Sequence, residues 1–385
     1  MPTRTLRAFG LCCLLALTAP AAAQEDPVAE EEPADKKPGD DGWPDISSFL
    51  DQKFGFLPIV VPITEPAVGY GAAFGAAFLS KPFGAARQGL GRPNVTFVGG
   101  MATENGSWGA FAADMRYWLD DRLQTLAGVI YADVNLDFYG IGEDSVLADD
   151  PLRYTLNPVG IGLQAKYRVG DTNIWGGLSY AFAVMQVKFD PAANEAELPE
   201  FDETSRVAGL TLVASYDSRD NLFTPLRGTF AELSFGFFGK YLGGEDNFER
   251  LGLVAIQYIP LPFNLYFGAR GDFSASFGNA PFYLQPYVDL RGIPVMRHQG
   301  EEVAQLDTEL RWQFWGRLSV LAFIGVGGAW NDFEHVDNFT GIVAGGPGIR
   351  YELAREYGIH MGIDVGFSRD ATAFYIQVGN AWFRP

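Results

Sequence analysis

The chain has 385 residues, with 28 basic and 47 acidic side chains and a formal net charge of -19. No basic field is available to neutralise phosphates, which argues against a nucleic-acid partner. The length allows one large domain or two ordinary ones.

Residues 1–23 have the pattern of a secretory signal peptide. Its parts are a basic start at Arg4 and Arg7, an apolar run over residues 8–17 and small residues at 21–23. Both cysteines, Cys12 and Cys13, lie in this segment. The mature chain is therefore expected to have no disulfide, no thiolate metal site and no cysteine nucleophile.

Residues 24–54 are expected to precede the folded domain. The stretch 24–41 is rich in Asp, Glu, Pro and Ala, a composition that cannot bury a core and predicts disorder. Residues 44–51 fit either a short helix, with Pro44 near its first turn, or a plain linker. We therefore predict an acidic disordered tail and a short periplasmic segment over 24–54.

Alternating strands are predicted from residue 55 to residue 385. No run of 18 apolar residues follows the predicted signal peptide, so no membrane helix is expected. In the stretch 303–314, one face is apolar and aromatic and the other is polar or charged, because side chains alternate along a strand. A soluble sheet shows this pattern too. Export and a content of 46 glycines, 31 Phe, 16 Tyr and 8 Trp favour an outer-membrane barrel.

About sixteen strands are expected, an even number that suits a closed antiparallel barrel. They are placed near 56–63, 68–78, 93–103, 106–119, 122–137, 153–168, 171–188, 205–218, 227–240, 247–259, 263–277, 303–315, 317–331, 341–353, 357–369 and 371–383. If the first strand runs outward, the long connections 138–152, 189–204, 278–302 and 332–340 lie outside. Most short turns then lie on the periplasmic side, with 80–92 and 219–226 as longer exceptions.

The stretch 357–369 specifies its register most clearly. Its apolar residues, expected to face lipid, are Ile359, Met361, Ile363, Val365 and Phe367. Its other face carries Asp364, which would cost several kcal/mol toward lipid and is therefore expected to face inward.

Three segments resemble the bacterial surface antigen family, the BamA/TamA-type outer-membrane assembly and translocation barrels. The first runs from Phe56-Leu57-Pro58-Ile59 to Gly69-Tyr70-Gly71. The second runs from Tyr216-Asp217-Ser218-Arg219-Asp220 to Arg227-Gly228 and resembles the family's mid-barrel periplasmic turn. The third is Leu290-Arg291-Gly292-Ile293, with Glu309-Leu310-Arg311 downstream. The chain also ends on Gly379-Asn380-Ala381-Trp382-Phe383, like a barrel-assembly signal.

The resemblance implies that a loop carrying Arg291 and Gly292 folds back into the lumen and locks there. Family members usually carry a carboxylate two residues after a Phe to hold this arginine, but here the stretch reads Phe323-Ile324-Gly325. Candidate replacement partners are Glu309, Asp307 and Asp364, because a buried guanidinium without a carboxylate is costly. The roughly thirty residues between the predicted signal and the barrel leave no room for the family's periplasmic POTRA domains.

The resemblance also implies sites outside the loop. Asp217, Arg219, Asp220 and Gly228 form the periplasmic turn motif, in which the acidic residues bond local backbone rather than act as a catalytic acid pair. The seam between the first and last strands involves Gly379 and Phe383, and Gly379 is expected to weaken it so that it opens laterally.

The function implied is insertion or translocation of polypeptide, or lipid, at the bacterial outer membrane, gated by the Arg291 loop. A passive channel and a structural surface protein remain as alternatives. Expected partners are outer-membrane lipid and either client polypeptides or a periplasmic subunit. No enzyme motif such as G-x-S-x-G, a P-loop or H-E-x-x-H occurs, and no cofactor is expected. The scattered His298, His335 and His360 make no metal set.

Overall fold

The computed structural model describes residues 41–47, 57–79, 94–140, 147, 151–189, 201–331 and 341–384. The predicted signal peptide and most of the predicted acidic tail lie outside this part of the chain. So do residues 48–51 of the helix considered for 44–51, the predicted connections 80–92 and 332–340, and most of the predicted connections 138–152 and 189–204.

Sixteen strands form a single antiparallel sheet in which each strand pairs with its neighbours in sequence. The strands are β1 Leu57–Ile63, β2 Gly71–Leu79, β3 Val95–Thr103, β4 Trp108–Trp118, β5 Leu123–Phe138, β6 Leu152–Arg168, β7 Ile174–Phe189, β8 Phe201–Asp217, β9 Gly228–Phe238, β10 Phe248–Leu261, β11 Leu265–Gly278, β12 Glu302–Trp315, β13 Leu318–Trp330, β14 Ile342–Ala354, β15 Ile359–Phe367 and β16 Thr372–Val378. This order confirms the prediction of an all-β antiparallel barrel of sixteen strands.

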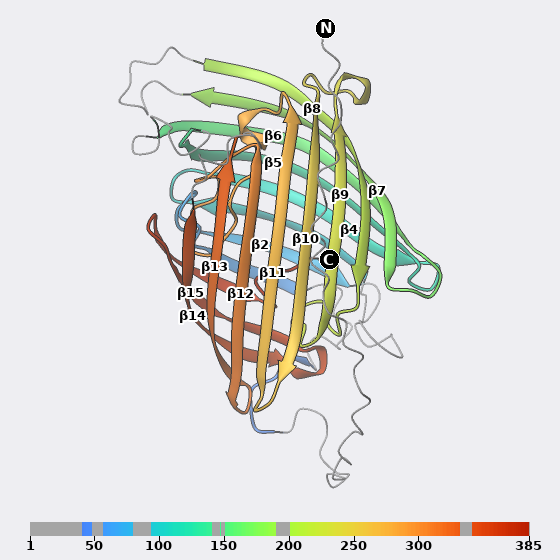
Figure 1. The fold of residues 1–385 in the computed structure, drawn as a ribbon, viewed down its shortest axis with the longest axis vertical. Coiled ribbons are helices and arrows are strands. Elements are labelled where there is room, and N and C mark those ends of the chain that lie inside the picture. Colours follow the sequence, from blue (N-terminus) through green and yellow to red (C-terminus); the bar gives the residue numbers. More distant parts are fainter. Residues whose placement is uncertain are drawn as a thin grey trace, which may run out of the picture.

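The sheet curls so that β1 comes near β16, with β10, β11 and β12 side by side along the near wall of Figure 1. Among the residues that the structure describes, three 3-10 turns lie in the connections: η3 Lys240–Leu242, η4 Phe282–Leu284 and η6 Arg355–Tyr357. In the described residues, no helix has the length and apolar character needed to cross a membrane.

The alternation of side chains on β12 is confirmed. Leu306, Leu310 and Trp312 are exposed on the outer face, whereas Asp307 and Arg311 are buried inside. The same holds on β15, where Met361, Ile363 and Phe367 are exposed outward and Asp364 is completely buried. A barrel in lipid needs an apolar outer face and allows a polar inner face. The pairing of neighbouring strands also satisfies their backbone hydrogen bonds in lipid.

The last strand is shorter than predicted. β16 ends at Val378, and Gly379 then takes a φ of +85°, which turns the chain out of the sheet. The N–H of Gly379 donates to the carbonyl of His360, and that of Asn380 donates to the carbonyl of Phe223. These partners lie at the end of the barrel that carries the short turns, so the segment 379–384 does not continue the sheet as alternation alone suggested.

The contact between β1 and β16 differs from every other contact between neighbouring strands. Within the described residues, no ladder of backbone hydrogen bonds joins them. The Thr64 hydroxyl donates to the carbonyl of Phe374, and the Tyr70 and Phe374 rings stack with centroids 6.3 Å apart. The barrel is therefore nearly closed, with a seam held by side chains.

Candidate functional site

The connection between β11 and β12, residues 279–301, folds back into the barrel as two arms and a tip. Tyr287 and Gln299 form an isolated antiparallel bridge, and the Val288 N–H donates to the His298 carbonyl at 3.0 Å. The tip, residues 289–297, lies between these arms. An inward-folded loop was predicted from the family resemblance, and its arms explain how so long a connection keeps a defined shape.

A tight turn places Arg291 at the end of the tip. The Ile293 N–H donates to the Leu290 carbonyl at 3.0 Å, and Gly292 at the third position has a φ of +101°. A turn with positive φ at this position favours glycine. A Cβ on Gly292 would also meet the backbone of Gly366 at 3.0 Å. Glycine is therefore needed both for the turn and for its close approach to β15.

Further hydrogen bonds attach the tip to the barrel wall. The Gly292 N–H donates to the Tyr375 hydroxyl at 2.9 Å, and the Ser368 hydroxyl donates to the Gly292 carbonyl at 2.7 Å. On the other side, Arg270 donates to Asp289 at 3.1 Å. The tip is thus fixed on β11 through Arg270, on β16 through Tyr375 and on the turn after β15 through Ser368.

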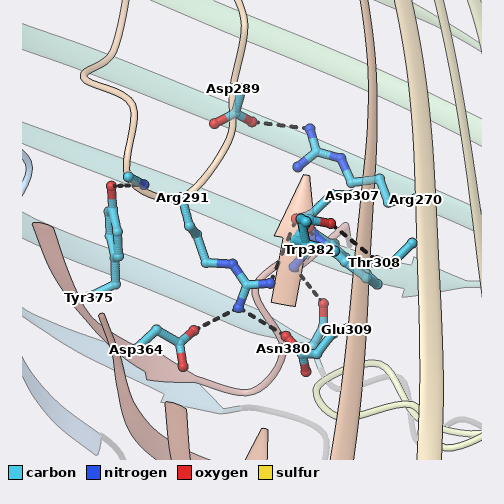
Figure 2. A network of polar contacts seen from close by, with 12 residues as sticks. Arg270, Asp289, Arg291, Asp307, Thr308, Glu309, Asp364, Tyr375, Asn380 and Trp382 are labelled. Atoms are coloured by element: carbon cyan, nitrogen blue, oxygen red, sulfur yellow. Dashed lines mark hydrogen bonds and ion pairs between the residues drawn. The ribbon is translucent and has the colours of Figure 1, made fainter. Parts of the chain in front are cut away.

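Three carboxylates surround the Arg291 guanidinium, and Figure 2 shows it reaching between Asp364 and Glu309. Its Nη1 donates to Asp364 at 2.7 Å and to Glu309 at 2.9 Å, while its Nη2 lies 3.6 Å from Asp307 Oδ2. The structure therefore brings together Arg291 and all three carboxylates that the sequence offered as partners. Burial alone would lower the pKa of Arg291, but these carboxylates raise it above its ordinary value.

Arg350 and the Phe323 ring make contacts with this ion-pair network that the sequence did not predict. Arg350 on β14 forms a two-pronged pair with Asp364, at 2.5 and 2.8 Å. The guanidinium carbon of Arg291 lies 3.7 Å from the centroid of the Phe323 ring, a cation–π contact. A buried ion pair that loses one partner costs about 3–5 kcal/mol. Asp364 is therefore paired with both arginines inside the barrel.

Leu290 takes the place beside Gly325 where family members usually carry the carboxylate. A Cβ on Gly325 would lie 2.7 Å from a methyl carbon of Leu290. Leu290 belongs to a buried apolar cluster with Val288, Ile293 and Val303, among others. The carboxylate missing from β13 is therefore replaced by an apolar contact there, and Asp364 on β15 supplies the charge.

The C-terminal segment adds an unpredicted contact to the network. The Trp382 indole N–H donates to Asp307 at 2.8 Å, and the side chain is 4% exposed. Its ring lies 6.1 Å from that of Tyr258. Phe383 stacks on Phe223 at 5.8 Å instead of lying on a strand at the seam. Neither Gly379 nor Phe383 is thus at the β1–β16 contact, because the chain turns inward at Gly379.

The loop also contacts both sides of the seam. The Val295 N–H donates to Glu65, in the turn after β1, at 3.0 Å. Across the seam, His298 lies 2.8 Å from Asp370, and Arg297 lies 3.5 Å from it, in the turn before β16. Burial raises the pKa of Glu65, and burial lowers that of His298 against the opposing effect of Asp370. These contacts place the loop as a bridge over the seam.

The turn between β8 and β9 is built from charged residues that satisfy each other and the backbone. The Arg219 side chain, fully buried, donates from Nε and Nη2 to Asp217 at 2.9 and 3.0 Å. Its Nη2 also donates to the Arg384 carbonyl at 2.8 Å. Asp220 accepts from the Leu226 N–H at 3.0 Å, and Gly228 has a φ of +106°. Here the acidic side chains bond the turn, and the motif also holds the C-terminal segment.

The histidines lie apart from one another. His298 is in the loop and His360 is buried on β15, whereas His335 lies outside the described residues. Within the ranges that the structure describes, no group of three His, Cys, Asp or Glu side chains could hold a metal ion.

Comparison with known proteins gives a family match. The Omp85 superfamily domain matches residues 109–367. The fold is similar to that of BamA from Haemophilus ducreyi lacking POTRA domains 1-3, at 13% identity and a TM-score of 0.57, over 83% of this chain and 68% of that one. No curated protein matches this chain.

Two further solved structures are also similar. CdiB from Escherichia coli has 13% identity and a TM-score of 0.55, over 83% of this chain and 61% of that one. CdiB from Acinetobacter baumannii has 10% identity and a TM-score of 0.53, over 84% of this chain and 60% of that one. This chain spans less than two thirds of either CdiB chain. At these identities the likeness concerns the fold alone.

Proposed function

Because this chain belongs to the Omp85 superfamily, we propose that this outer-membrane barrel inserts or translocates polypeptide, or lipid, and is gated by its inward loop. The family suggests the activity, and the loop and seam of this chain suggest how that activity is gated. The residues assigned to the gate are Arg291, Gly292, Asp307, Glu309 and Asp364.

The observation that carries this proposal is the seam. Every other pair of neighbouring strands is joined by a backbone ladder, whereas the described parts of β1 and β16 are not. A strand edge in lipid needs partners for its N–H and C=O groups, which an incoming strand of a client can supply. The seam is thus the place where a client chain enters the wall of the barrel.

The loop controls the seam in this mechanism. Its contacts with Glu65 on one side and with Asp370 and Tyr375 on the other hold the two edges in place. Arg291 fixes the loop through the ion-pair network. Release of Arg291 frees these edge contacts together, so that the lumen opens and the seam loosens in one step.

A disulfide across the seam tests the proposal. Cysteines at Thr64 and Phe374, in a chain without its two natural cysteines, are oxidised in proteoliposomes. We expect the oxidised barrel to lose its ability to insert an unfolded outer-membrane protein, and reduction to restore it. The control disulfide joins Val98 and Ala112, which are partners in the β3–β4 ladder, and leaves insertion unchanged. Full activity of the oxidised Thr64–Phe374 pair would refute the proposal.

Single-channel conductance separates this function from a passive channel. A gated barrel gives small, flickering currents that become large and steady in Arg291→Ala. A channel gives steady currents in both proteins. A structural surface protein gives neither conductance nor insertion.

A further inference from the structure

A second cluster of interacting side chains lies at the end of the barrel that carries the short turns, away from the ion-pair network. The β12–β13 turn supplies Arg317, whose side chain is 1% exposed. The neighbouring β14 and the turn after it supply Tyr351 and Arg355. The segment 41–47, which precedes the barrel in sequence, covers all three of these residues.

Charge and hydrogen-bond geometry both fit the segment to this site. Arg317 holds Asp41 with two hydrogen bonds, from Nε at 2.7 Å and from Nη2 at 2.9 Å. Its Nη1 donates to Asp45 at 2.7 Å, and Arg355 donates to Asp41 at 3.1 Å. A planar guanidinium that binds two carboxylates in this way is selective for their spacing as well as their charge.

An aromatic contact lies between the two carboxylates. The Trp43 ring meets the Trp315 ring edge-on, with centroids 5.1 Å apart and planes at 80°, and it lies 6.2 Å from the Tyr351 ring. Gly316 leaves room for it, since a Cβ there would lie 2.9 Å from the Trp43 ring. The main chain of the segment is held too, because the Ile46 N–H donates to the Leu353 carbonyl at 3.0 Å.

We propose that Trp315, Arg317, Tyr351 and Arg355 form a peptide-binding site for a tryptophan flanked by two carboxylates, which the chain's own residues 41–47 occupy. The contacts described above join the segment to the end of β12, to the β12–β13 turn, to β14 and to the turn after it, and none of them involves the inward loop. The site is therefore separable from the inward loop. A free peptide with the same chemistry competes for it.

The number of residues between the segment and β1 limits how far β1 can move away while the segment stays bound. Nine residues connect Ser47 to Leu57 at the start of β1, which span about 35 Å at most. The three strand spacings from β14 to β1 amount to about 15 Å. This length allows the segment to stay bound while the seam opens by up to about 20 Å. The binding of the segment does not depend on the function proposed above.

Peptide binding to the full chain tests this inference. In one variant, residues 41–47 are replaced by Gly and Ser so that the site is vacant. A fluorescent peptide Asp-Gly-Trp-Pro-Asp-Ile-Ser is titrated, and its anisotropy is measured. We expect binding to the vacant variant and at least tenfold weaker binding to the natural chain, whose own segment competes at a high effective concentration.

Two variants locate the binding. Adding Arg317→Gln to the vacant variant should weaken binding at least tenfold, as should a peptide with Ala in place of Trp. The matched control is Arg122→Gln, which removes an exposed arginine from another short turn, where it pairs with Asp171. Heat-modifiable mobility on a gel confirms that each barrel is folded. Equal binding with and without Arg317, or no binding to a folded vacant variant, would overturn the inference.

Discussion

Arg291 joins the loop to three carboxylates of the barrel wall. Replacement by Ala leaves the buried Asp364 and the half-buried Glu309 with one cation fewer, so we expect a loss of about 3–5 kcal/mol in the stability of the docked loop. Hydrogen exchange of residues 286–299 measures it. Arg206→Ala is the control, because its pair with Glu245 is exposed and such pairs contribute about 1 kcal/mol or less. Similar exchange in both variants would contradict the expectation.

Gly292 and Gly366 test the close approach of the tip to β15. Gly292→Ala adds a side chain at positive φ, which costs about 1–2 kcal/mol, and brings its Cβ against the Gly366 backbone. Gly366→Ala introduces the clash alone, 2.7 Å from the Gly292 nitrogen. We expect both variants to speed proteolysis of the loop. Gly271→Ala should not, since nothing lies within 4 Å of its Cβ.

At the scale of elements, the C-terminal segment 379–384 contacts the ion-pair network through Trp382. Trp382→Phe keeps most of the ring but removes the hydrogen bond to Asp307. A hydrogen bond to a charged group is worth about 1.5–3 kcal/mol, so we expect faster hydrogen exchange at Ala381 to Arg384. The lipid-facing Trp312→Phe is the control. Unchanged exchange in Trp382→Phe would mean that the indole N–H does not hold the segment.

The strands were predictable because the alternation of apolar and polar residues is a local signal in the sequence of each strand. On β12 and β15 the alternation of apolar and charged residues fixes both existence and register, and Asp364 can face only inward. The family resemblance added the inward loop. The three partners of Arg291 were predicted because Asp307, Glu309 and Asp364 were expected to face inward. Alternation also extended the last strand to Phe383, which was wrong, because Gly379 turns the chain toward Phe223 and His360.

The missed contacts share a physical cause. Trp382 meets Asp307, and Asp41 meets Arg317, across 75 and 276 residues of sequence. Local propensity says nothing about such pairs, because they depend on which strands stand opposite each other once the sheet has curled. The one usable signal was the sequence Asp-Gly-Trp-Pro-Asp at 41–45, where a tryptophan stands out within an acidic stretch.

At the scale of the whole molecule, we expect acid to release the segment 41–47 from the barrel. Hydrogen bonds from Arg317 hold the pKa of Asp41 below its ordinary value, although burial opposes them. A depressed pKa stabilises the bound segment above the unfolded value of about 3.9, and this stabilisation is lost as pH falls through the bound value. We therefore expect release below about pH 4, measured by protease cleavage near residue 43. Although burial opposes them, hydrogen bonds with Ser47 and Arg317 also hold the pKa of Asp45 below its ordinary value. The double variant Asp41→Asn, Asp45→Asn should therefore abolish this pH dependence, and an unaltered release profile in that double variant would contradict the expectation.

The contact between Leu290 and Gly325 has a consequence for how this sequence can change over evolutionary time. A carboxylate at position 325 would clash with the leucine that fills the space beside it, and a smaller side chain at 290 would leave a void beside Val288 and Ile293. The two positions should therefore vary together among homologues: a small residue at 290 where 325 carries Asp, and a large apolar one where 325 is Gly. A carboxylate at position 325 alone, or a smaller side chain at position 290 alone, should lower the stability of the barrel.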